Sequence, residues 1–213
     1  VEHGLEISHL GDLPSRSGMG SSSAFTVGLL KALYALEGKM ITKYDLSYEA
    51  IHIEQRVLKE NVGSQDQVSA AFGGLNKIEF HPNGSISVMP ITIPPQRLED
   101  LNRHLMLFYT GIQRTSSEVT ESFVRRMDEK KRQLRIMKDL VEESIDLLNG
   151  SGDILQFGEL LQEAWDSKKT FSNSVSNADV DRMHSLALEA GAISGKITGA
   201  GGGGFLLLFV PSA

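Results

Sequence analysis

The stretch "GDLPSRSGMGSSSAF" at residues 11–25 constrains this chain most, because it places three glycines and five serines directly before a helical pattern. Apolar residues then recur at helical spacing and predict a buried helix from Ser23 to Gly38. A helix start presents unpaired N–H groups and the positive end of the helix dipole, so it binds anions readily. Gly18 and Gly20 allow the backbone to approach an anion closely. The stretch therefore predicts either an anion-binding loop or a flexible turn with serine caps.

Two common phosphate-binding loops do not match this stretch. A Walker A loop requires a Lys-Ser/Thr pair after its glycines, and here none follows. A dinucleotide-binding loop requires a third glycine where Ser23 stands. If the stretch binds phosphate, most of the compensating positive charge has to come from elsewhere in the fold.

The composition narrows the class of partner. The 213 residues suit one large domain or two small ones, and 40% hydrophobic with 23% charged residues is ordinary for a globular protein. A net charge of −6 disfavours nucleic acid and anionic membranes as partners. The sequence has no cysteine, which excludes disulfides and thiolate metal sites. No apolar run approaches the roughly 20 residues that span a bilayer, so we expect a cytoplasmic protein.

The rest of the pattern predicts an α+β protein in two lobes. The first lobe is expected to contain a strand at residues 4–8, a helix at 43–60 capped by Thr42, a short helix within 62–74 capped by Ser64, and a hairpin at 75–93. The paired prolines of "IPPQRLED" predict an end of regular structure and a domain boundary, which gives domains at 1–95 and 96–213. The second lobe is expected to contain a strand at 104–111, helices at 116–148, 153–170 and 178–190, and a strand–glycine loop–strand unit at 192–210.

Three separated stretches together point to a family. In order they are "PSRSGMGSSSA" (14–24), "GSQDQVSAAFGG" (63–74) and "KITGAGGGGF" (196–205). They resemble the GHMP kinases, named for galactokinase, homoserine kinase, mevalonate kinase and phosphomevalonate kinase. The first stretch matches the family's second motif at every position, and the last matches its third motif. "HIEQRVLKENVGSQDQ", "YTGIQRTSSE" and "AWDSKKTFSNSVSN" look most like the branch of D-glycero-D-manno-heptose 7-phosphate kinases.

This resemblance implies a fold and a reaction. The fold would be two-lobed, with an N-terminal lobe like ribosomal protein S5 domain 2 and a ferredoxin-like α+β C-terminal lobe. The reaction would be ATP- and Mg²⁺-dependent transfer of phosphate to a sugar or sugar phosphate, at the anomeric hydroxyl of a heptose 7-phosphate. The family's first motif has no match after Val1, so we expect part of the N-terminal lobe to be missing from this sequence.

The resemblance also assigns roles to residues. Asp66 would accept or orient the proton of the substrate hydroxyl, although an aspartate at a helix start also stabilises the helix dipole alone. Glu54 and Ser22 would bind magnesium, since a hard cation prefers oxygen ligands, although a helix glutamate is usually solvated. The residues expected to bind the nucleotide are Pro14, Gly18, Met19, Gly20, Ser21, Ser22, Ser23, Gly199, Gly201 and Gly202.

Substrate residues are expected around "TGIQRT" and on a later helix. Gly111, Arg114 and Thr115 follow a predicted strand, and Arg114 could bind a sugar's phosphate through a bidentate contact or simply face solvent. Lys168 is a further candidate for that phosphate, although "DSKK" on a helix is usually a solvated face.

Other functions stay open at this point. The chain could be a fucokinase-like, galactokinase-like or mevalonate-type kinase, a catalytically silent sugar or nucleotide sensor, or an unrelated structural domain. Ser22, Glu54 and Asp66 argue against a sensor, which needs no base. The expected partner is a small-molecule sugar, and a homodimer is left open.

Overall fold

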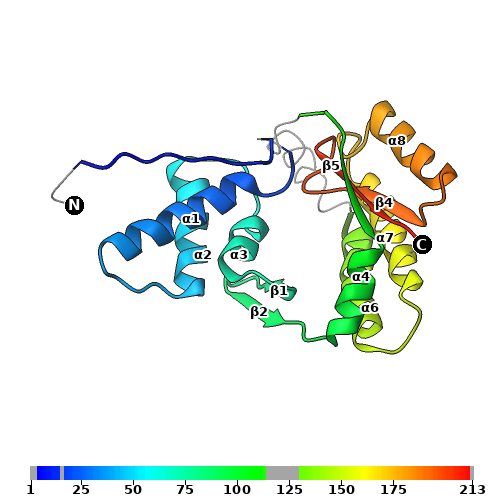
Figure 1. The fold of residues 1–213 in the computed structure, drawn as a ribbon, viewed down its shortest axis with the longest axis horizontal. Coiled ribbons are helices and arrows are strands. Elements are labelled where there is room, and N and C mark those ends of the chain that lie inside the picture. Colours follow the sequence, from blue (N-terminus) through cyan, green and yellow to red (C-terminus); the bar gives the residue numbers. More distant parts are fainter. Residues whose placement is uncertain (1–3, 15–16, 114–129, 212–213) are drawn as a thin grey trace.

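The computed structural model describes residues 4–14, 17–113 and 130–211, and these residues form two lobes joined by the short segment 91–94 (Figure 1). Each lobe contains helices and antiparallel strands, so the predicted α+β class is confirmed. The predicted boundary at residues 95 and 96 lies at the first residues of a helix of the second lobe. None of the described helices is long and apolar enough to cross a membrane.

The first lobe is a cluster of helices with one hairpin. It contains α1 (Ser21–Leu36), α2 (Lys43–His52), the π-helical turn η1 (Ile53–Val57), α3 (Gln65–Phe72), β1 (Asn76–Phe80) and β2 (Ile86–Pro90). Val27 and Leu30 of α1 pack against Leu46 and Ala50 of α2 in a small apolar core. The hairpin was predicted, and its strands pair from Asn76 opposite Pro90 to Phe80 opposite Ile86. This packing fixes the starts of α1 and α3 relative to η1.

Several local predictions for this lobe are confirmed and others are wrong. Thr42 caps α2 as predicted, because its hydroxyl accepts a hydrogen bond from the Asp45 backbone N–H. Ser64 does not cap α3, since its hydroxyl accepts a hydrogen bond from the Gln55 amide instead. The helix predicted over 43–60 changes to a π turn after His52. Residues 4–8 are extended but form no strand, because no other described segment pairs with them.

The second lobe is a three-stranded antiparallel sheet packed against helices. Its elements are α4 (Pro95–Arg103), β3 (Leu105–Tyr109), α6 (Lys131–Asn149), α7 (Leu155–Lys169), α8 (Ala178–Glu189), β4 (Ser194–Ile197) and β5 (Phe205–Phe209). The strand order is β3-β5-β4. Trp165 of α7 and Val180 of α8 pack with Ile197 and Leu206 of the sheet. Phe209 of β5 belongs to a second apolar core. The predicted strand–loop–strand unit is therefore confirmed as β4 and β5.

The predicted proline break and the predicted long helix both concern this lobe. The prolines of "IPPQRLED" lie at a break in regular structure, because residues 91–94 between β2 and α4 are irregular. The break ends at Pro95, which stands at the first position of α4, where a missing N–H costs no hydrogen bond. The long helix predicted from Ser116 is described only from Lys131 onward, and its first part lies outside the described residues.

Lys77 of β1 and Glu142 of α6 form an ion pair of 2.5 Å between the lobes.

Candidate active site

The start of α1 has no side-chain cap. Gly20 stands at the N-cap with φ 66°, a left-handed conformation that glycine adopts at little cost, and no side chain there accepts from the helix N–H groups. α1 begins at Ser21, two residues before the predicted start at Ser23. Because no side chain caps the first N–H groups, they can donate hydrogen bonds to a phosphate oxygen.

Glu54 lies buried beneath this helix start. It sits on the π turn η1 and is 1% exposed. Its Oε2 accepts hydrogen bonds from the Ser23 hydroxyl at 2.9 Å and from the Gln67 amide at 2.5 Å. Its Oε1 is buried and has no hydrogen-bond partner among the residues that the structure describes. No lysine or arginine of the described residues forms an ion pair with Glu54. A buried carboxylate with one unused oxygen and no such partner is suited to binding a cation.

The donor set fits magnesium, which the GHMP resemblance implies. Over the described ranges, no group of three or more His, Asp or Glu side chains converges on one point. A cation at Glu54 would therefore take most of its ligands from phosphate oxygens and water, which is how Mg²⁺ usually binds beside nucleotides. Glu54 contacts the hydroxyl of Ser23, whereas Ser22, the predicted ligand, is exposed at the same helix start.

Asp66 faces the glycine loop from the first turn of α3. A β-carbon built on Gly20 would lie 3.2 Å from the Asp66 Cγ, so the carboxyl group rests against the Gly20 backbone. The residue as a whole is exposed, but burial of its carboxyl and then the negative charge of Glu54 raise the pKa of Asp66 above its usual value. An aspartate with a raised pKa beside an anion-binding helix start is placed to accept a proton from an incoming hydroxyl.

The loop between β4 and β5 meets the glycine loop from the second lobe (Figure 1). A β-carbon on Gly199 would lie 2.8 Å from the Gly18 carbonyl oxygen, and one on Gly18 would lie 3.1 Å from the Thr198 carbonyl oxygen. Gly204, at φ +91°, packs so closely that a β-carbon there would overlap the Ser17 carbonyl oxygen. The two loops are thus in backbone contact, and the site lies where the lobes meet.

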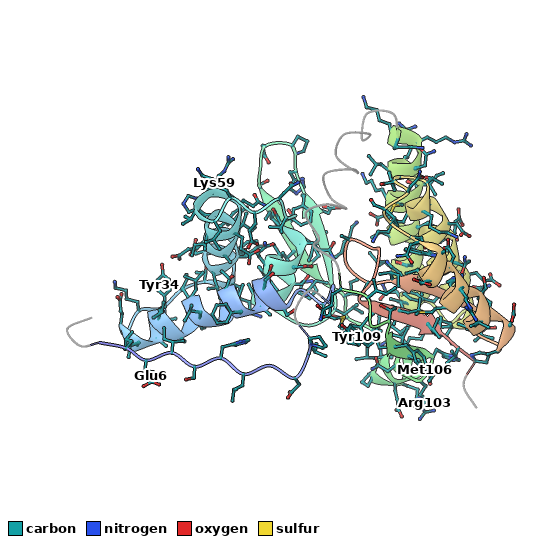
Figure 2. The ribbon with its side chains drawn as sticks, turned by 90° about the horizontal axis from the view of Figure 1, so that it is seen from above. Glu6, Tyr34, Lys59, Arg103, Met106 and Tyr109 are labelled. Atoms are coloured by element: carbon teal, nitrogen blue, oxygen red, sulfur yellow. The ribbon has the colours of Figure 1, made fainter. Side chains whose placement is uncertain are left out.

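The residues that follow β3 form hydrogen bonds with the loop between β4 and β5. Tyr109 ends β3 near the junction of the lobes, on the lobe that also carries the labelled Arg103 and Met106 (Figure 2). The next residue, Thr110, donates to the Gly204 carbonyl oxygen through its N–H and its hydroxyl, both at 2.8 Å. The Gly204 N–H donates to the Ile112 carbonyl at 2.8 Å. Gly111, a predicted substrate residue, therefore lies beside the second glycine loop.

Lys168 approaches this loop from the end of α7. Its ammonium group donates to the Gly199 carbonyl at 2.5 Å. Burial, and then the charge of Lys196 on β4, lowers the pKa of Lys168 from 10.5 to about 8. Burial likewise lowers the pKa of Lys196. The site therefore combines carboxylates on one lobe with lysines on the other.

The remaining predicted residues divide into three groups. Pro14, Met19 and Ser21 lie along the glycine loop or at the helix start, and Met19 is 37% exposed. Gly201 and Gly202 are buried, and the Gly202 N–H donates to the Val175 carbonyl, so their nucleotide contact stays a prediction. Arg114 and Thr115 lie outside the described residues.

Three polar residues of the site were missed or passed over in the sequence. Gln67 is fully buried and orients Glu54, and its only sequence signal is its place directly after Asp66. Ser17 is fully buried at the contact between the loops, and Thr110 fastens the second loop. Each lies within two residues of a motif position, which is the signal that could have found it.

Comparisons with known proteins identify the family of this chain. Residues 2–74 match the model of the GHMP kinases N terminal domain, and residues 127–213 match that of the GHMP kinases C terminal domain. A D-glycero-alpha-D-manno-heptose 7-phosphate kinase from Campylobacter jejuni is 34% identical over 93% of this chain and 59% of its own length.

Two solved structures extend the similarity to the fold. A D-glycero-D-manno-heptose 1-phosphate kinase from Bacteroides thetaiotaomicron aligns with a TM-score of 0.67 at 30% identity, over 93% of this chain and 55% of that one. A putative sugar kinase from Campylobacter jejuni aligns with a TM-score of 0.67 at 33% identity, over 94% and 57%. This chain thus spans a little over half the length of each of these relatives. The two matching family models and the shared fold show that the chain belongs to the GHMP kinase family.

Proposed function

We propose that this chain forms the phosphate-transfer site of an ATP-dependent sugar kinase. The observation that carries the proposal is the buried Glu54, with one unused carboxylate oxygen, beside the exposed start of α1 and next to Asp66. Phosphoryl transfer needs positioning and charge stabilisation more than covalent chemistry from the protein. The uncapped helix start would bind phosphate oxygens, and Glu54 with the hydroxyl of Ser22 or Ser23 would hold magnesium.

In this mechanism the carboxylates have separate tasks. When bound, magnesium would neutralise charge on the phosphates of ATP. Asp66 would accept the proton of the attacking sugar hydroxyl, and its raised pKa makes it a better acceptor than an ordinary carboxylate. Gln67 and Ser23 would hold Oε2 of Glu54, which keeps Oε1 directed to the cation.

For the substrate we propose a heptose phosphate, with the anomeric hydroxyl of heptose 7-phosphate as acceptor. The support is the heptose phosphate named for the relatives at 34% and 30% identity. Those two names place the phosphate at different carbons, so a test has to include both compounds. Lysines at the second glycine loop favour a phosphorylated sugar over an uncharged one.

The test is ATP consumption with magnesium against a panel of sugars, using the protein in its full reading frame. The panel contains heptose 7-phosphate, heptose 1-phosphate, fucose, galactose and mevalonate, and phosphorus NMR identifies the phosphorylated carbon. The proposal predicts turnover on heptose 7-phosphate with a new anomeric phosphate. Turnover on fucose, galactose or mevalonate alone would refute the substrate but keep the reaction. ATP binding without turnover on any compound would favour a sensor.

A further inference from the structure

Two lysines of the second lobe converge on the loop between β4 and β5. Lys168 is near the C-terminal end of α7, where it donates to the Gly199 carbonyl at 2.5 Å, and Lys196 is on β4, against which α7 packs. Both residues are partly buried. Gly199 in turn lies on Gly18 of the first glycine loop. Lys168 therefore contacts the loop that meets the first glycine loop, and Lys196 precedes that loop on β4 and lies close enough to Lys168 for its charge to act on it.

These lysines have no acidic partner in the described part of the chain. No ion pair joins either of them to a carboxylate there, and the nearest acidic residue of α7, Asp166, pairs with Lys169 at 3.0 Å. Lys169 also lies over the Trp165 ring. Burying two positive charges near each other is unfavourable, and it becomes favourable once an anion binds between or beside them. Lys169 thus has a carboxylate partner, whereas Lys168 donates only to a backbone carbonyl and neither Lys168 nor Lys196 has a carboxylate partner among the described residues.

Hydroxyl groups at the same loop contact also lack partners. The Thr198 hydroxyl, two residues after Lys196, is buried without a hydrogen-bond partner among the described residues, and so is that of the fully buried Ser17. Thr198 and Ser17 both contact the junction of the two loops, through Gly18 and Gly204. Each of these hydroxyls has a proton that it donates to no described residue. Together with the Lys168 and Lys196 ammonium groups, they offer donors that an anion with several oxygens could use.

We propose that Lys168 and Lys196 form a phosphate subsite beside the 199–204 loop, which binds a phosphate group of a reactant in the kinase site. The inference rests on the proposed kinase function and deepens it. Two reactants carry such a group, namely the sugar phosphate and ATP. In the proposed kinase the helix start and Glu54 would serve the phosphates of ATP from the other lobe, so we assign this subsite to the sugar's own phosphate.

Three variants test the subsite: Lys168→Met, Lys196→Met and the matched control Lys169→Met. Calorimetry on the protein in its full reading frame measures binding of heptose 7-phosphate, of the unphosphorylated heptose and of ATP with magnesium, and thermal unfolding shows that each variant is folded. We expect Lys168→Met and Lys196→Met to weaken heptose 7-phosphate binding at least about tenfold, the size of one charge-assisted contact, while heptose binding is unchanged. Lys169→Met should keep wild-type binding of all three ligands.

The other outcomes have defined meanings. A loss confined to ATP would support the phosphate subsite and assign it to the nucleotide. Unchanged binding of both phosphate-bearing ligands would overturn the inference. An equal loss for heptose and heptose 7-phosphate would also overturn it, because Lys168 would then only support the loop through Gly199. If wild type phosphorylates no sugar yet binds a phosphate compound through Lys168 and Lys196, the kinase proposal fails and the subsite stands.

Discussion

This protein should become more stable as the pH rises above about 8, because the buried Lys168 loses its positive charge there in the folded state. Its pKa is lowered from 10.5 to about 8 in the folded state, first by burial and then by Lys196. In that interval the unfolded chain carries a proton on Lys168 that the folded chain has lost, so stability increases with pH. Each pKa unit corresponds to about 1.4 kcal/mol. The difference between 10.5 and about 8 therefore gives at most about 3 kcal/mol, and less where solvent screens the ammonium group.

Lys168→Met removes the titrating group and keeps the length of the side chain. We expect the variant to be more stable than wild type near pH 7, offset by about 1 kcal/mol for the lost hydrogen bond to Gly199. The advantage should shrink steadily and then reverse as the pH rises toward 10. Urea unfolding of both proteins at a series of pH values measures this difference, and groups shared by the two proteins cancel. Parallel stability curves over the whole range would refute the reasoning.

Three further predictions follow from other contacts. Gly204→Ala should destabilise the protein by about 2 kcal/mol or more and weaken ATP binding, because its β-carbon would overlap the Ser17 carbonyl; an unchanged thermal midpoint would contradict the loop contact. Glu54→Gln should remove the increase in ATP affinity that magnesium causes, measured by calorimetry with magnesium and with a chelator; a wild-type increase would show that Glu54 does not hold the metal. His184 is buried and its pKa is lowered from 6.5, chiefly by burial, so acidification from about 6.5 down to its folded pKa should destabilise wild type more than His184→Gln, as urea unfolding would show; equal acid sensitivity would contradict this.

The helices and loops were predictable where the sequence carries a strong local signal. Thr42 followed by helical spacing located α2, and the run of glycines between two apolar segments located the β4–β5 unit. Pro95 begins α4 although a break was expected there, because proline is as acceptable at the first turn of a helix as in a linker. Residues 4–8 have the composition of a strand, but a strand also needs a partner, and local pattern cannot supply one.

The candidate site was predictable only as far as its motifs. Glu54 and Asp66 were both expected, and the structure places Glu54 in a buried position that a helix glutamate rarely takes. That burial depends on the π turn after His52 and on hydrogen bonds from Ser23 and Gln67, which are 31 and 13 residues away along the chain. For Lys168 the sequence pattern was more typical of a solvated helix face, because its contact with Gly199 joins α7 to a loop far along the sequence.

The most direct test of the account compares wild type with Asp66→Asn in phosphate transfer from ATP to heptose 7-phosphate. Asparagine keeps the size of the side chain but cannot accept the proton, so turnover should fall by about 100-fold or more. ATP affinity should stay within about twofold of wild type, because Asp66 contacts the glycine loop without holding the nucleotide. Turnover close to that of wild type in Asp66→Asn would contradict the central claim that Asp66 receives the proton at this site.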